Sequence, residues 1–89
     1  MEKVLLVYSM KGCPHCTEFK KMLENENIDF LDRDIDEHQE EYDLFTQLTN
    51  DLVPAFMIVE SETEKAEYFA PDIDFQELEE ALSIVKEKM

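Results

Sequence analysis

Glycine, cysteine and basic side chains are all scarce in this chain. Its 89 residues include one glycine, two cysteines, and eight lysines and arginines against 23 aspartates and glutamates, which gives a net charge of −15. A surface this acidic repels nucleic acid and anionic membranes, so we expect neither as a partner. The charge either keeps the protein in solution or favours a protein partner with a basic face.

Long apolar runs are also missing. The N-terminal apolar run, Val4 to Tyr8, is far shorter than the apolar segment of a signal peptide or a membrane-spanning helix. The chain contains no repeat, low-complexity stretch or linker. With 44% hydrophobic residues, six phenylalanines among them, it can still form a small core. We therefore expect residues 1–89 to form a single cytoplasmic domain that folds alone as a monomer.

Both cysteines lie in one motif, Cys13-Pro14-His15-Cys16. If Cys13 caps a helix that begins at Pro14, the proline loses no hydrogen bond, and the free N–H groups of the first turn face the Cys13 sulfur. These groups and the positive end of the helix dipole favour the thiolate, the form that attacks disulfides. Cys16 is placed to attack the mixed disulfide that results, and we expect it to be less exposed than Cys13. The motif therefore predicts a redox-active pair.

Two other interpretations of this motif remain open. A zinc site needs four ligands, and only His15 and His38 are further candidates, with no second C-x-x-C and no H-x₃₋₅-H spacing. His38 is predicted in the exposed first turn of a helix, where a solvated histidine is the commoner case. The pair could also be purely structural. The alternative function of a different class is a non-catalytic metal-binding module, holding zinc or a bridging iron–sulfur cluster through Cys13 and a partner's thiols.

The rest of the sequence alternates between strand and helix patterns. Continuous apolar runs predict buried strands, and apolar residues at every third or fourth position predict amphipathic helices. Capping-box spacings, Asp36 with Gln39 and Asp74 with Glu77, indicate the starts of the last two helices. We expect strands at 4–8, 28–35, 55–59 and 65–69, and helices at 14–27, 36–49 and after 74. The order β-α-β-α-β-β-α predicts an α/β fold.

Gly12 and Pro54 are the two backbone positions that stand out. Gly12 directly precedes Cys13, which indicates a backbone angle that other residues avoid, a close approach by a partner, or only an ordinary loop. Pro54 stands at the mouth of the predicted strand 55–59, where its missing N–H need not interrupt the sheet. On base rates alone the peptide bond before Pro54 would be trans.

In length, element order and motif positions, the whole chain resembles the glutaredoxins, small members of the thioredoxin superfamily. The stretch from Tyr8 to Cys16 is similar to the family's active-site stretch, and Val53-Pro54 is similar to its Thr-Val-Pro with Leu52 in place of threonine. The resemblance implies a four-stranded mixed sheet flanked by three helices, and a cis peptide bond before Pro54, which lies against the catalytic disulfide. It also implies that the Val53 backbone pairs like a strand with an incoming thiol substrate.

Three positions depart from the family pattern. His15 replaces the usual tyrosine. With this residue the motif, Cys-Pro-His-Cys, is instead similar to the active site of the periplasmic disulfide oxidases. A histidine between the cysteines makes the disulfide more oxidising. Ala70-Pro71 replaces the Gly-Gly that helps to cradle glutathione, so it narrows the site and removes an N–H group. Met10 replaces a common lysine, for which Lys11 can substitute.

The resemblance implies a dithiol–disulfide oxidoreductase that reduces protein or glutathione mixed disulfides. Cys13 would be the nucleophile and Cys16 the resolving thiol, and Pro14 and His15 complete the catalytic motif.

The implied glutathione site comprises Lys11, Val53, Pro54, Asp72 and Asp74. The two aspartates could pair with the amino group of glutathione or, instead, cap the last helix. We expect no bound metal or organic cofactor. Glutathione would be the reducing cosubstrate, bound more weakly than in a typical glutaredoxin, or a thioredoxin-reductase-type enzyme would supply the electrons.

Overall fold

The computed structural model describes residues 3–48, 52–63 and 65–89, with the backbone alone for Leu48. Within them lie β1 (Lys3–Ser9), α1 (Pro14–Asn25), β2 (Leu31–Asp34), α2 (Gln39–Leu48), β3 (Ala55–Glu60), β4 (Lys65–Phe69) and α3 (Leu78–Lys88). This order confirms the predicted α/β fold. No helix in the described part of the chain has both the length and the apolar character needed to cross a membrane.

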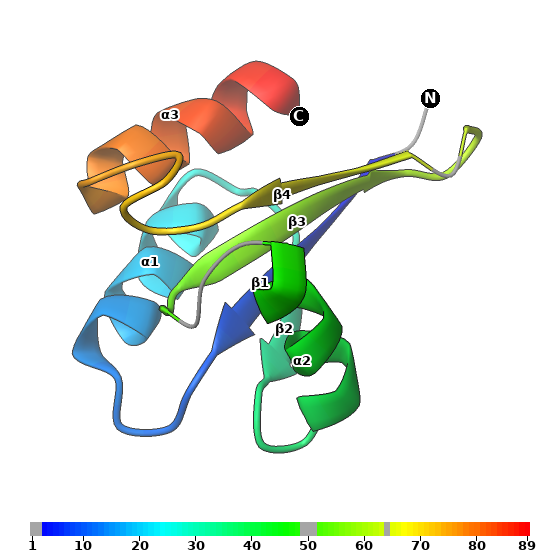
Figure 1. Ribbon diagram of the computed structural model, residues 1–89. Helices are drawn as coiled ribbons and strands as arrows, with labels where there is room; N and C mark the ends of the chain where they lie inside the picture. The colour runs from blue at the N-terminus through cyan, green and yellow to red at the C-terminus, as the bar shows by residue number, and fades with distance from the viewer. Residues whose placement is uncertain (1–2, 49–51, 64) are drawn as a thin grey trace.

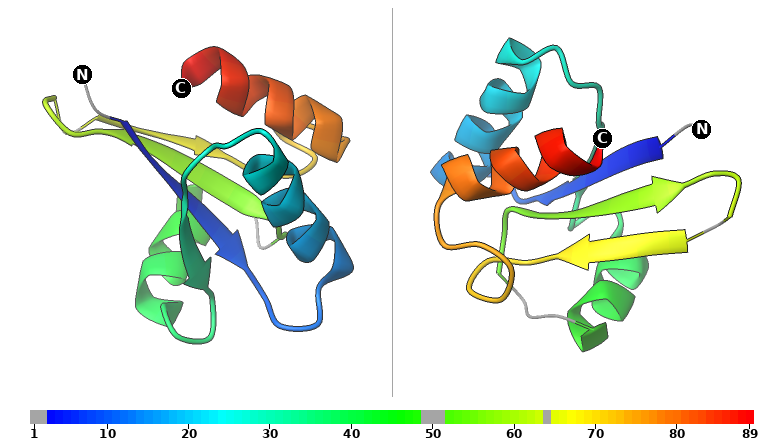
Figure 2. Two further views of the ribbon diagram at one scale, coloured as in Figure 1. Left: turned by 180° about the vertical axis from the view of Figure 1, so that it is seen from behind. Right: turned by 90° about the horizontal axis from the view of Figure 1, so that it is seen from above.

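The four strands form one mixed sheet in the order β2-β1-β3-β4. β1 is parallel to β2 and antiparallel to β3, and β3 and β4 form the expected antiparallel hairpin. Helices α1 and α3 cover one face of the sheet and α2 covers the other (Figures 1 and 2). Tyr8, near the end of β1, pairs with Ala55, the first residue of β3. The loop after β1 therefore begins beside the segment that leads into β3.

The larger core lies between the sheet and the helices α1 and α3. Its centre is Phe56 of β3, which is fully buried. The ring centroid of Phe56 lies 5.6 Å from that of Phe19, 4.9 Å from that of Phe69 and 5.7 Å from that of Phe75. These rings come from α1, β4 and the segment before α3, so one side chain joins three parts of the chain.

A smaller aromatic cluster lies under α2, on the opposite face of the sheet. Tyr8 contacts Tyr42 and Phe45 there, with ring centroids 6.0 and 4.8 Å away. Burial raises the pKa of Tyr8 well above its usual range. The carboxylate of Glu41 accepts a hydrogen bond from the Tyr8 hydroxyl, and its negative charge raises this pKa further. The phenol therefore stays neutral and serves as a hydrogen-bond donor inside the protein.

Helix α2 begins at Gln39, two residues later than the capping-box spacing predicts, because that spacing makes Asp36 the N-cap and residue 37 the first helical residue. The carboxylate of Asp34 accepts a hydrogen bond from the N–H of Asp36 over 2.9 Å, and the carbonyl of Asp34 accepts one from the N–H of His38 over 3.0 Å. These bonds form a turn at the end of β2, so Asp36 does not cap the helix. The predicted helix end at Thr49 lies outside the described residues.

The structure also shortens the predicted α1 and β2. Asn27 has a left-handed backbone, with φ of +58°, and the N–H of Ile28 donates to the carbonyl of Leu23 over 2.9 Å, which ends the helix. Ile28 and Phe30 pack against the larger core, so the chain joins the sheet only at Leu31.

Candidate active site

The cysteine motif lies where α1 begins, directly after β1. Cys13 is the N-cap of α1, with φ of −96° and ψ of 106°, and Pro14 is the first helical residue. The backbone N–H of Cys16 donates to the sulfur of Cys13 over 3.2 Å, and a disulfide joins the two cysteines. The predicted capping is confirmed, and the positive end of the helix faces the Cys13 sulfur.

The two cysteines differ in their access to solvent. The exposed fraction is 9% for Cys13 and 1% for Cys16, as the sequence pattern predicts. Pro14 and His15 are exposed between them. Cys13 is therefore the more accessible of the two cysteines, and Cys16 is almost fully buried.

Gly12 gives the loop before the motif its shape. Its φ is +77°, a left-handed conformation that favours glycine, and nothing lies within 4 Å of the position that a Cβ would take. The N–H of Cys13 donates to the carbonyl of Met10 over 3.3 Å and closes the turn. Of the interpretations that the sequence left open, the structure supports the unusual backbone angle.

A groove of about 170 Å³ lies beside the motif. It is lined by His15, Val53, Pro54, Pro71, Phe75, Gln76, Glu77 and Leu78. The peptide bond between Val53 and Pro54 is cis, as the resemblance implies. The fold thus brings His15, Val53 and Pro54 together, and it adds the segment before α3 as a second wall.

Val53 offers its backbone to this groove. The residue is half-buried, and no described residue hydrogen-bonds its N–H or C=O. An extended peptide chain can pair with both groups, as an added strand pairs with the edge of a sheet. This is the one feature of the predicted glutathione site that needs no particular side chain.

Lys11, Asp72 and Asp74 lie outside the lining of the groove. The carboxylate of Asp74 accepts a hydrogen bond from the N–H of Ala70 over 2.9 Å, which closes a compact loop that also holds Asp72 at φ of +66°. The N-cap of α3 is Glu77, so the prediction that Asp74 caps this helix is wrong. The loop uses the Asp74 side chain for its own closure, and the helix begins only after it.

The sequence analysis missed the second wall of the groove, formed by Phe75, Gln76, Glu77 and Leu78. One carboxylate oxygen of Glu80 accepts hydrogen bonds from the N–H groups of Gln76 and Glu77, over 3.3 and 3.0 Å. The sequence does contain a signal for this wall: Glu77 with Glu80 is a second acidic pair at capping-box spacing, three residues after Asp74 with Glu77.

A polar network that the sequence did not indicate joins α1 to the sheet. Ser9, which is buried, donates a hydrogen bond to the carboxylate of Asp32 over 2.8 Å. The ammonium of Lys20 lies 3.0 Å from the other oxygen of Asp32 and 3.4 Å from the Ser9 hydroxyl. Because Lys20 lies one turn after Cys16, the network anchors the middle of α1 to the last residue of β1 and to the second residue of β2.

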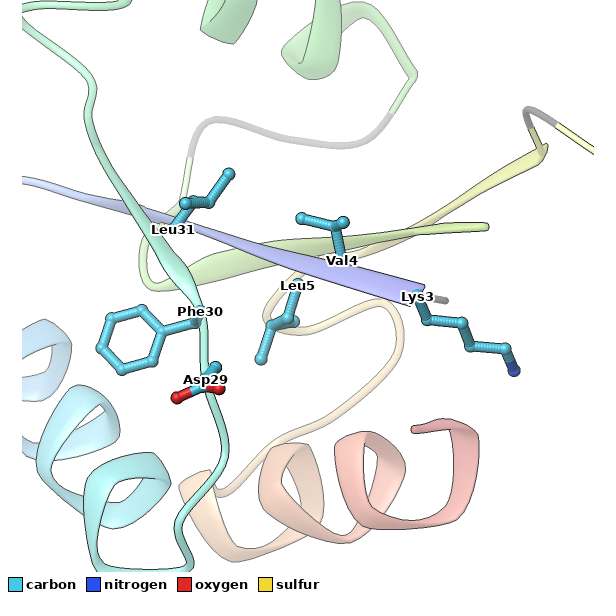
Figure 3. A pocket seen from close by; sticks show the side chains of 6 residues that line it. All are labelled: Lys3, Val4, Leu5, Asp29, Phe30 and Leu31. Atoms are coloured by element: carbon cyan, nitrogen blue, oxygen red, sulfur yellow. The ribbon is translucent and has the colours of Figure 1, made fainter. Parts of the chain in front are cut away.

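The structure has a second cavity of about 170 Å³ at the far end of β1, away from the disulfide (Figure 3). It is lined by Lys3, Val4, Leu5, Asp29, Phe30 and Leu31. None of the predicted site residues lies there. Among the described residues, no group of three or more His, Cys, Asp or Glu side chains is arranged to hold a metal ion.

The family model described as Glutaredoxin matches the chain over residues 5–61. The match includes the cysteine motif and Val53-Pro54 and ends before the loop and helix start that form the second wall of the groove. Comparison with curated proteins gives no match.

Proposed function

This chain belongs to the glutaredoxin family, and on that premise we propose that it is a dithiol–disulfide oxidoreductase with Cys13 as nucleophile and Cys16 as resolving thiol. The family and the C-x-x-C pair imply thiol–disulfide redox activity. The observation that carries the assignment of roles is the hydrogen bond from the Cys16 N–H to the Cys13 sulfur, on the more exposed of the two cysteines. Stabilising negative charge on that sulfur favours the attacking thiolate.

The reaction proceeds in two exchanges. The Cys13 thiolate attacks one sulfur of the substrate disulfide, and the other sulfur leaves as a thiolate. The Cys16 thiolate then attacks the Cys13 sulfur and releases the second substrate thiolate, which leaves the Cys13–Cys16 disulfide. Two electrons pass to the substrate. Two molecules of glutathione, or a thioredoxin-reductase-type enzyme, return the pair to the dithiol.

Val53 and Pro54 are the proposed docking residues for the substrate. No residue in the described part of the chain hydrogen-bonds the N–H or C=O of Val53, which supports strand-like pairing with the chain that carries the reacting sulfur. Lys11, exposed two residues before Cys13, would attract a substrate carboxylate at longer range. Asp72 is exposed and stays a candidate partner of a substrate amino group, whereas the Asp74 carboxylate already bonds Ala70.

Turnover and metal content, measured on the same freshly purified protein, test the proposed function. We expect it to reduce a small disulfide catalytically with either glutathione or a thioredoxin-reductase-type enzyme as electron source, and to contain no stoichiometric zinc or iron. Stoichiometric metal without turnover would instead establish the metal-binding module.

His15 is the residue that we propose sets the redox potential of the pair. A histidine between the two cysteines stabilises the Cys13 thiolate and thereby the dithiol form, so His15→Tyr is expected to make the pair more reducing. A shift of about 30 mV corresponds to roughly 1.4 kcal/mol for this two-electron couple. Equilibration with glutathione redox buffers, followed by mass spectrometry, measures it.

The matched control for His15→Tyr is His38→Tyr. His38 lies at the start of α2, beside Glu41 and outside the groove. Its replacement is expected to leave the potential unchanged. An equal shift in both variants, or none in His15→Tyr, would show that His15 has no specific effect on the pair.

A further inference from the structure

The groove beside the disulfide has two walls of different chemistry. Val53 forms one side, and no described residue hydrogen-bonds its backbone N–H or C=O. The opposite wall runs from Pro71 through the start of α3, at the positive end of a helix dipole. A helix start of this kind commonly binds an anion through its free N–H groups. Whether it can do so here depends on where those groups already donate.

The loop before α3 uses its N–H groups for its own closure. Ala70 donates to the Asp74 carboxylate over 2.9 Å, and Pro71 has no N–H to donate. Asp72 donates to the carbonyl of Phe75 over 2.8 Å. Ile73 and Asp74 both donate to the carbonyl of Ala70, over 3.3 and 3.0 Å. None of these five positions has a backbone donor left for a substrate carboxylate.

The start of α3 is occupied in the same way. Gln76 and Glu77 direct their N–H groups at a single carboxylate oxygen of Glu80. That carboxylate takes the place that an anionic ligand would take. Glu77 contributes the one carboxylate among the described residues that line the groove, and His15 is the only other ionisable side chain in that lining. Glu80 bonds the start of α3 beside the groove without lining it. The groove thus carries negative charge, and the N–H groups of Gln76 and Glu77 are already bonded to a carboxylate of the chain itself.

We propose, resting on the redox function above, that this groove selects disulfides in polypeptides that carry a lysine or arginine beside the reacting cysteine. The Val53 backbone pairs with the substrate chain, and the carboxylates of Glu77 and Glu80 attract its cationic side chain. Anionic disulfides, glutathione's among them, are the disfavoured class. The net charge of −15 acts in the same direction at longer range.

Three chromophoric probes test this selection in a single turnover. Two synthetic peptides of equal length each carry one cysteine as a mixed disulfide with 2-thiopyridine, flanked by lysines in one and by glutamates in the other. The third probe is the same mixed disulfide of glutathione. Cys13 of the pre-reduced protein attacks the cysteine sulfur of the probe and expels thiopyridone, and Cys16 then releases the peptide or glutathione thiol. Rates with a neutral small thiol correct for the intrinsic reactivity of each probe.

After this correction, the lysine probe is expected to react about 10-fold faster than the other two at low ionic strength, which corresponds to roughly 1.4 kcal/mol. The ratio should fall as salt is added, because exposed charges are screened. The double variant Glu77→Gln/Glu80→Gln should lower it to about 3-fold. Glutamine keeps an acceptor oxygen at the start of α3, so the helix retains its cap.

The matched control is Glu24→Gln/Glu62→Gln, which makes the same change of net charge at two exposed positions outside the groove. We expect it to leave the ratio near that of the wild type. An equal fall in the control would assign the effect to net charge and overturn the proposal.

Other outcomes separate this inference from the proposed function. Reduction of all three probes at equal corrected rates, or a preference for the glutathione probe, overturns the selection and leaves the redox function standing. A wild-type ratio of corrected rates that does not change with salt has the same meaning. This measurement uses the wild-type protein alone, so it does not depend on the folding of a variant. Failure to reduce any probe overturns both.

Discussion

Replacing Cys13 with serine is expected to abolish disulfide reduction, leaving only the background rate of uncatalysed exchange. A serine hydroxyl is not ionised near neutral pH, even at a helix N-terminus, so it cannot replace the thiolate. Cys16, the other cysteine, has an exposed fraction of 1% and cannot meet a protein disulfide directly. Reduction of a protein disulfide by the pre-reduced variant, followed by labelling of the released thiols, measures the loss.

Cys16→Ser is the matched comparison, because it removes one thiol from the same motif but keeps the exposed one. This variant is expected to retain the attack by Cys13 and to accumulate the mixed disulfide that Cys16 would otherwise resolve. It should still act on glutathione mixed disulfides while losing the dithiol reduction of proteins. If Cys13→Ser were as active as the wild type, or if Cys16→Ser were the more severe change, the assigned roles would be wrong.

Phe56→Ala is expected to destabilise the protein by about 3–5 kcal/mol. Phe56 is fully buried and contacts the rings of Phe19, Phe69 and Phe75, so its loss leaves a cavity where α1, β4 and the segment before α3 meet. A domain of this size has a total stability of roughly 5–15 kcal/mol. Urea unfolding monitored by circular dichroism would show a midpoint well below that of the wild type, and near zero denaturant if the wild type lies at the lower end of this range.

The control for Phe56→Ala is Leu44→Ala on α2. The Leu44 side chain is 66% exposed, so its truncation is expected to change the free energy of unfolding by about 0.5 kcal/mol or less. If both variants had the same urea midpoint, the packing around Phe56 would not be the main support of the fold. Because Phe75 also lines the groove, a folded Phe56→Ala variant should in addition show weaker substrate docking.

Local features were predictable because the residues that decide them are neighbours in the chain. The N-cap at Cys13, the first helical position of Pro14 and the greater burial of Cys16 all depend on four consecutive residues, and the structure confirms them. The element order followed from apolar periodicity in the same way. The cis bond before Pro54 came only from the family resemblance, because base rates favour trans.

The helix starts were harder to predict because several acidic residues compete for the same backbone donors. Near α2, Asp34 at the end of β2 forms a turn, so Asp36 does not take the N-cap role that the sequence predicts. Near α3, Asp74 bonds Ala70 and leaves the helix start to Glu77 and Glu80. The pairs Asp36 with Gln39, Asp74 with Glu77 and Glu77 with Glu80 all have the spacing of a capping box. Spacing alone does not show which of these side chains the folded chain places beside a free backbone N–H group.

By itself the sequence determined the redox pair, its helix N-terminus and the order of strands and helices. The groove was decided by the tertiary structure alone. It forms only when the pairing of β1 with β3 brings Val53 beside His15, and when the chain after β4 brings Glu77 into the same groove. The physical reason is that a thiolate is stabilised by adjacent N–H groups, whereas substrate selection depends on charges and donors from three distant segments.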